Sequence, residues 1–303
     1  MRPDRIPHRS VVPAALTPFT TDLEVDLDEF GLHIESLASV DGVTAIMVNG
    51  ASGQDTTLTR HEKTSLLERA IEVTGRSVPI LGAVRESEIE SDLGVLARDA
   101  ESTGVDAIVI MPPGNPDDAS LDGALTRFSK VTESCALPIA FYQVSPQRNG
   151  YAVETMAELA KLDRVFAVKE GSGTPETSEA DSRAMRAADP NIAIWSTHSR
   201  WLLGDLSMGA DGLLSGMGSI NADLHVALCR AVWNSDLEEA RRINDRLWPL
   251  TQVYYRAGQN PHTRMKYALK RIGRLREDIV RPPLKPLDSA EMSLVDSILD
   301  GYE

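Results

Sequence analysis

The sequence alternates between short apolar runs and longer segments whose apolar residues recur at helical spacing. Eight apolar runs occur, at residues 11–16, 43–48, 78–83, 105–111, 138–142, 165–169, 192–195 and 211–215. Such alternation predicts parallel strands joined by right-handed crossovers. Eight units within 303 residues indicate an α/β fold of the closed (β/α)8 type, the TIM barrel. A doubly wound open sheet is the alternative, but no GxGxxG motif follows the first run.

The last quarter of the chain shows no further strand pattern. Apolar residues recur at helical spacing over 237–255 and 263–275, and a final helix is expected over 289–299. The segment 281–286 holds too many prolines for a helix interior and is expected to be an ordered connector. We therefore expect a barrel domain over residues 1–230 and a C-terminal helical extension, residues 231–303, packed on it.

Composition excludes several classes of partner. The net charge of −14 argues against nucleic acid, whose phosphates would be repelled. No stretch approaches the roughly 20 apolar residues of a membrane span. The first nine residues lack the apolar region of a secretory signal, so a cytoplasmic protein is expected. The two cysteines, Cys135 and Cys229, show no CxxC spacing, and no cluster has metal-ligand spacing, so neither a disulfide framework nor a metal cofactor is expected.

Lys169 is the residue most suggestive of chemistry. It ends an apolar run and precedes a glycine-rich turn, which places it at the carboxyl end of a buried strand. Burial disfavours the charged form of a lysine, and a neutral amine can form a Schiff base with a ketone or an aldehyde. The preceding run ends in Tyr142, a phenol able to move a proton in that chemistry. Barrel active sites lie at these strand ends, so Lys169 and Tyr142 are the predicted catalytic pair.

Two glycine-rich turns at other strand ends are candidates for substrate binding. The turn at 50–53 combines Gly50, Ser52 and Gly53, and its exposed backbone N–H groups suit a carboxylate. A plain connection between a strand and a helix is an equally good interpretation of this turn. Ser215 begins the second turn, at 215–220, where tight packing at the barrel mouth competes with substrate contact.

Arg148 is the predicted partner of a substrate carboxylate, because a guanidinium fork matches a carboxylate and Arg148 follows Tyr142 closely. Arg85, just past the third run, competes for the same role. His198 lies in a polar loop after the seventh run and titrates near neutral pH when unperturbed. A lone loop histidine is more often incidental, so no role is assigned to it.

With these residues in view, the chain resembles the dihydrodipicolinate synthase/N-acetylneuraminate lyase family over nearly its whole length. The matching segments are AALTPF at 14–19, GASG at 50–53, FYQV at 141–144, VKEGS at 168–172 and GADGLLS at 209–215. The resemblance implies a (β/α)8 barrel with a helical extension, usually tetrameric. It also implies that Lys169 forms a Schiff base with pyruvate or another 2-oxo acid, that Tyr142 moves protons, and that Gly50 and Ser52 belong to the carboxylate-binding turn.

The chain departs from the family pattern at positions that carry protons in dihydrodipicolinate synthases. Ala51 replaces the first hydroxyl residue of the turn, and Gly114 stands where a tyrosine normally completes the relay from a neighbouring subunit. Gln143 replaces the usual asparagine, and Arg148 matches the family arginine only if one extra residue is allowed. Without the shared tyrosine, a dimer would serve the chemistry as well as a tetramer.

Three hypotheses about function follow. The main one is a class I lyase of the aldolase type that uses no metal or other cofactor, acting on a 2-oxo acid and an aldehyde through Lys169. A dehydratase of a deoxy-keto sugar acid that uses the same imine is the alternative within enzymes. A catalytically silent relative that binds a small oxo acid is the alternative from another class.

Overall fold

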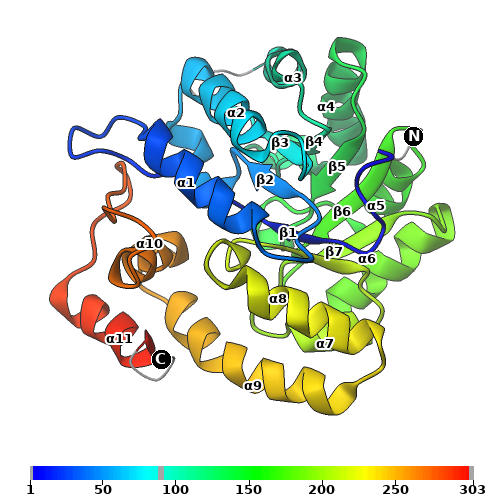
Figure 1. Ribbon diagram of the computed structural model, residues 1–303. Helices are drawn as coiled ribbons and strands as arrows, with labels where there is room; N and C mark the ends of the chain where they lie inside the picture. The colour runs from blue at the N-terminus through cyan, green and yellow to red at the C-terminus, as the bar shows by residue number, and fades with distance from the viewer. Residues whose placement is uncertain (1–2, 88–91, 300–303) are drawn as a thin grey trace.

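The computed structural model describes residues 3–87 and 92–299. Eight parallel strands form one sheet in the order β1-β8-β7-β6-β5-β4-β3-β2. A parallel bridge between Ala14 and Met47 brings the two end strands together and completes the barrel. The predicted (β/α)8 barrel is confirmed (Figure 1). The strands are β1 (Val11–Pro13), β2 (Ile46–Val48), β3 (Ile80–Val84), β4 (Ala107–Ile110), β5 (Ile139–Tyr142), β6 (Val165–Glu170), β7 (Ala193–Ser196) and β8 (Gly212–Ser215).

The helices that follow the strands start where local caps favour them. Thr59 and Glu62 form a reciprocal capping box at the start of α2, and Asp26 accepts a hydrogen bond from the Glu29 backbone at the start of α1. The barrel helices are α1 (Leu27–Ala38), α2 (Arg60–Thr74), α3 (Leu93–Thr103), α4 (Leu121–Ser134), α5 (Val153–Ala160), α6 (Pro175–Ala188), α7 (Leu202–Ser207) and α8 (Gly218–Trp233).

Two apolar cores follow from the alternation of side chains along each strand. On β4, Ile108 and Ile110 face the helices, whereas Ala107 and Val109 fill the barrel. Inside, small alanines from several strands surround the edge-to-face pair of Phe166 and Trp195, whose ring centroids lie 5.7 Å apart. The interior of the barrel is therefore filled by side chains.

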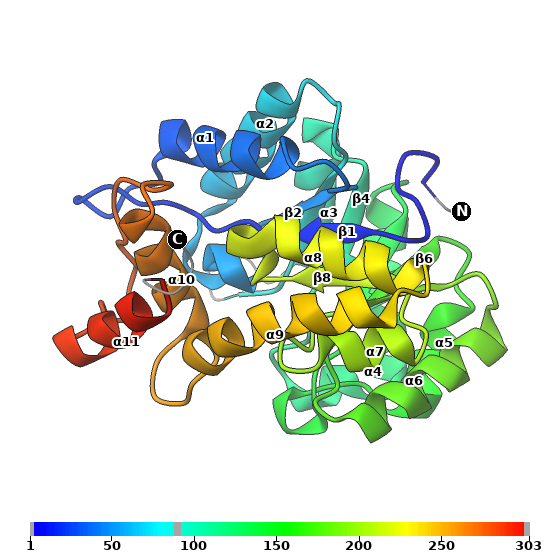
Figure 2. The same cartoon turned by 60° about the horizontal axis from the view of Figure 1, so that its bottom comes forward.

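The C-terminal segment forms α9 (Leu237–Tyr254), α10 (Pro261–Arg271) and α11 (Ser289–Leu299), which run along one side of the barrel (Figures 1 and 2). Gln54, in the turn after β2, exchanges two hydrogen bonds with the backbone of Arg281, at 3.0 and 3.2 Å. Arg281 also pairs with Glu62 of α2. These contacts hold α10 beside the barrel mouth. The division at residue 230 into two domains stays a prediction.

The predicted helix over 263–275 is shorter and shifted in the structure. Asn260 caps α10 by accepting a hydrogen bond from the His262 backbone, so the helix begins at Pro261. It ends at Arg271 because Gly273, with φ of 71°, turns the chain into the left-handed region. No helix among the described residues is long and apolar enough to cross a membrane.

Candidate active site

A cavity of about 380 Å³ opens at the carboxyl ends of the strands. Four predicted site residues line it, namely Ser52, Tyr142, Arg148 and Lys169. The remaining predicted ones, Gly50, Gly53 and Ser215, are not at its wall. A hollow of about 430 Å³ near Lys161 and Asn191 lies instead at the amino ends of β6 and β7, away from the end where barrels build their active sites.

Lys169 enters this cavity from β6, directly beside Tyr142 in the parallel register of β5 and β6. Its Nζ lies 4.1 Å from the centroid of the Tyr142 ring. Burial, together with the cations Arg85 and Arg148, lowers the pKa of Lys169 to about 7, and Asp55 opposes this shift. At pH 7 about half of such amines are unprotonated and therefore nucleophilic.

Tyr142 stays a protonated phenol in this setting. Burial raises the pKa of its hydroxyl, and the charges of Arg148 and Arg85 offset part of that rise. Arg148 also hydrogen-bonds the Tyr142 side chain. The arrangement gives a phenol that can donate a proton beside a lysine that can lose one.

The two candidate arginines, Arg85 and Arg148, differ in the groups that surround them. Arg85 forms an ion pair with the buried carboxylate of Asp55, with Nε 2.7 Å from Oδ2. Burial raises the pKa of Asp55, and the Arg85 charge counteracts that effect. Arg148 lies at the cavity wall. Of the two, Arg148 is the one that faces the cavity, whereas Arg85 acts on Lys169 through its charge.

The turn after β2 forms a short 3-10 helix, η1 (Ala51–Gly53), with Ser52 buried at its centre. A Cβ on Gly53 would lie 2.7 Å from Oγ1 of Thr17, so this position needs glycine. Ser215 is buried, and its Oγ accepts a hydrogen bond from the Met217 backbone at 3.2 Å. Gly53 and Ser215 thus support the wall of the cavity from behind.

Two side chains from the extension complete the cavity, and sequence patterns did not single them out. Tyr255 follows α9, and its hydroxyl hydrogen-bonds the side chains of Ser199 and Ser215. Burial raises the pKa of Tyr255 to about 12. His262 lies in the first turn of α10 and faces Lys169. Only the folding of the extension back over the strand ends brings these residues to the site.

Residues 7–301 match the model of the Dihydrodipicolinate synthetase family. The chain belongs to this family. It is 30% identical over 293 residues to the 4-hydroxy-tetrahydrodipicolinate synthase of Rhizobium meliloti (strain 1021), covering 95% of this chain and 96% of that protein. Identity to the synthase of Oceanobacillus iheyensis is 26% over 298 residues, with 97% of each chain covered.

The fold agrees with solved members of the family. The crystal structure of dihydrodipicolinate synthase from Thermotoga maritima is 25% identical and matches with a TM-score of 0.88, over 97% of this chain and 98% of that one. Membership in the dihydrodipicolinate synthetase family makes the chain a lyase of that type and confirms the resemblance noted in the sequence. Among residues 3–87 and 92–299, no group of three or more His, Cys, Asp and Glu side chains could hold a metal ion.

The structure also locates the departures from the family pattern. Ala51 lines the cavity, where it offers no hydroxyl. Gly114 is exposed, and its carbonyl accepts a hydrogen bond from Asn149 at 3.1 Å. Gln143 points away from the cavity and exchanges hydrogen bonds of 2.9 Å with the Tyr151 backbone. The hydroxyl groups that remain at the mouth of this family member are those of Ser52, Tyr142, Tyr255 and nearby loop residues.

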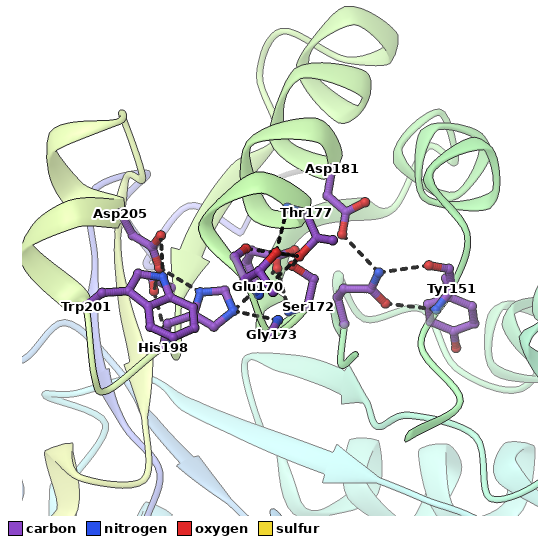
Figure 3. Close-up of polar contacts among 12 residues, drawn as sticks. Tyr151, Glu170, Ser172, Gly173, Thr177, Asp181, His198, Trp201 and Asp205 are labelled. Atoms are coloured by element: carbon purple, nitrogen blue, oxygen red, sulfur yellow. Dashed lines mark hydrogen bonds and ion pairs between the residues drawn. The ribbon is translucent and has the colours of Figure 1, made fainter. Parts of the chain in front are cut away.

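A polar network joins the end of β6 to the loop after β7 (Figure 3), and its His198 also lines the cavity. Nδ1 of His198 lies 2.7 Å from Oδ2 of Asp205, and its Nε2 accepts a hydrogen bond from the Gly173 backbone at 3.1 Å. Glu170 accepts a hydrogen bond from the Ser172 backbone, and burial raises its pKa to about 8. His198 is therefore fixed by two contacts, and through Gly173 it holds the loop that follows Lys169.

Proposed function

We propose that this chain is a class I lyase that joins Lys169 to pyruvate or a related 2-oxo acid as a Schiff base. The observation that carries the proposal is the Lys169 amine itself. It is buried, its pKa is lowered to about 7, and it faces a cavity while lying against the Tyr142 ring. A lysine with these properties is an activated nucleophile toward a carbonyl carbon.

The proposed reaction begins when the neutral amine of Lys169 adds to the keto carbon. Tyr142 donates a proton to the resulting alkoxide, and water then leaves to give a protonated imine. Cleavage of the bond between C3 and C4 leaves its electron pair on the imine as an enamine, while the C4 hydroxyl gives its proton to the Tyr142 phenolate and becomes an aldehyde. Protonation at C3 and hydrolysis release the 2-oxo acid and regenerate the lysine. The reverse sequence forms the same carbon–carbon bond.

Binding groups around the amine fit this substrate class. Ser52 and the backbone of the η1 turn are proposed to hold the carboxylate, so that the keto carbon faces Lys169. Arg148, which also lines the cavity, is proposed to bind an anionic or hydroxyl group of the second half of the substrate. These groups all come from one chain. Assembly into a homo-oligomer stays a prediction from the family resemblance.

Reductive trapping tests the proposal. Borohydride and pyruvate should add one reduced adduct to the intact protein, and peptide mapping should place it on Lys169. A panel of longer 2-oxo acids extends the test to related substrates. Absence of any adduct with the whole panel would refute the proposal and favour a silent binding protein.

Product analysis then separates the two enzymatic alternatives. Free pyruvate together with an aldehyde indicates a carbon–carbon lyase. A single dehydrated acid from a deoxy-keto sugar acid indicates that the imine expels water instead. Binding seen as thermal stabilisation without adduct or turnover indicates the silent relative.

A further inference from the structure

His262 stands at a point where three parts of the fold meet. It belongs to α10 of the extension, and its side chain lines the cavity that holds Lys169. Nε2 of His262 lies 2.8 Å from the place where a Cβ on Gly216 would stand, and Oγ of Ser52 lies 3.0 Å from the same place. The imidazole and the Ser52 hydroxyl therefore converge on one spot beside the turn after β2.

The imidazole has no hydrogen-bond partner of its own among the described residues. The hydrogen bond at this position is made by the backbone of His262, whose N–H donates to the Asn260 side chain at 2.8 Å. Polar groups inside a protein are normally hydrogen-bonded, so a ring facing a cavity without a partner is a candidate for ligand contact. The side chain is half-buried and open to the cavity, which allows such a ligand to reach it.

We propose that His262 is a second donor to the carboxylate of the bound 2-oxo acid, acting together with Ser52. This inference rests on the proposed Schiff-base function. The carboxylate lies one bond from the keto carbon that Lys169 attacks, so it must sit close to the amine. His262 faces Lys169 and adjoins Ser52, and both relations place it at the carboxylate end of the substrate.

The surroundings of His262 agree with this role. Burial and three cations, Lys169 on β6, Lys266 on α10 and Arg148 after β5, lower its pKa to about 3. The ring is therefore neutral at physiological pH and carries one N–H that can be donated. The same cations make the spot favourable for an anion, because a carboxylate placed there reduces their mutual repulsion.

Gly216 provides an independent probe of the same contact. Its lack of a side chain leaves room for the imidazole, and an added methyl group would stand 2.8 Å from Nε2. Gly216→Ala should therefore displace His262, and also press on Ser52, without changing the chemistry of either side chain. If both positions act through one contact, their effects on binding will not add, as a double-mutant cycle can show.

The test measures the initial rate of trapping as a function of pyruvate concentration. His262→Leu should raise the half-saturating concentration by about tenfold to a hundredfold, the range expected for losing one hydrogen bond to a charged group. The maximal rate of adduct formation should stay close to that of the wild type. His262→Gln, whose amide reaches to a similar position, should restore most of the affinity. His61→Gln, on the exposed surface of α2, is the matched control and should behave like the wild type.

Clear outcomes overturn the inference. A half-saturating concentration in His262→Leu within twofold of the control would refute it while leaving the Lys169 adduct in place. Unchanged half-saturation combined with lost deuterium exchange at C3 would show that His262 acts as a base instead. Should His262→Leu fail to fold, Gly216→Ala replaces it in the same measurement, and half-saturation within twofold of the control would again refute the inference. Failure of the wild type to form any adduct would instead refute the proposed function itself.

Discussion

Two lysines, one in the barrel and one in the extension, have similar local environments, but only the one in the barrel is proposed to react with a substrate. Lys169 is 4% exposed and Lys266 is 1% exposed, and burial lowers the pKa of each to about 7. Each ammonium lies over an aromatic ring, at 4.1 Å from the Tyr142 centroid and 4.2 Å from that of Phe19. Burial, pKa and ring contact therefore do not distinguish a nucleophile from a structural lysine.

The two lysines differ in whether the side-chain nitrogen borders a cavity and in whether it already donates a hydrogen bond. Nζ of Lys266 donates a hydrogen bond of 2.7 Å to the carbonyl of Ile279, inside the packed extension. Nζ of Lys169 has no hydrogen-bond acceptor among the described residues and borders the cavity. The ring beside it also carries a hydroxyl, whereas Phe19 carries none. A reactive amine thus needs an open approach and a proton carrier in addition to a lowered pKa.

The largest expected effect comes from exchanging the two lysines in turn for methionine. Lys169→Met should abolish the reduced adduct and lower turnover by about 10⁴-fold or more, since the nucleophile is gone. Lys266→Met should keep the adduct on Lys169. Intact mass and peptide mapping check both. An adduct on Lys266, or one that persists in Lys169→Met, would remove the basis of the comparison.

Tyr142→Phe makes the surroundings of Lys169 resemble those of Lys266. It keeps the ring and removes the proton carrier, so turnover should fall by about 10²- to 10³-fold. Trapping with saturating pyruvate should still reach completion, more slowly. Steady-state kinetics and the time course of adduct formation measure the two effects. Turnover within a few fold of wild type would show that another hydroxyl, such as that of Tyr255, moves the proton.

The pH dependence of imine formation should report the lysine in the cavity. The trapping rate at low pyruvate, measured with cyanoborohydride, should rise about tenfold per pH unit below pH 7 and level off above it, as the amine of Lys169 loses its proton. Arg85→Gln should move the midpoint upward, because the Arg85 cation lowers the pKa of Lys169. Arg183→Gln, on the exposed surface of α6, should leave the midpoint in place. A midpoint near the ordinary lysine value would contradict the proposed activation.

The smallest effect concerns stability. Lys169→Met should raise the free energy of unfolding at pH 6 by about 1–3 kcal/mol, because a buried ammonium is costly. The unfolded lysine keeps its proton up to about pH 10.4, so the wild type gains stability between pH 7 and that value and the difference shrinks. Lys266→Met should gain less, because it leaves the Ile279 carbonyl without its donor. Denaturant unfolding at pH 6 and pH 9 measures both, and a difference that grows with pH would contradict the assignment.

The sequence was informative wherever a residue's place depends on its own strand. Lys169 and Tyr142 end adjacent strands, and alternation along a strand is enough to bring them to the same barrel end. The sequence could not show which of Arg85 and Arg148 faces the cavity, because the ion pair between Arg85 and Asp55 joins two different loops. His262 could not be predicted at all, because its approach to Lys169 depends on how α10 packs. The contacts of a side chain across distant segments are set by tertiary packing, which the local pattern does not encode.

The reciprocal hydrogen bonds between Gln54 and Arg281 have a consequence for the timing of the chain's maturation. The proposed nucleophile is synthesised at residue 169, yet the wall that carries His262 is fixed beside it by a contact at residue 281. During translation Lys169 precedes Arg281 by more than a hundred peptide bonds. A nascent or truncated barrel therefore holds the Lys169 amine in an incomplete cavity. The C-terminal segment of the polypeptide completes the wall of that cavity.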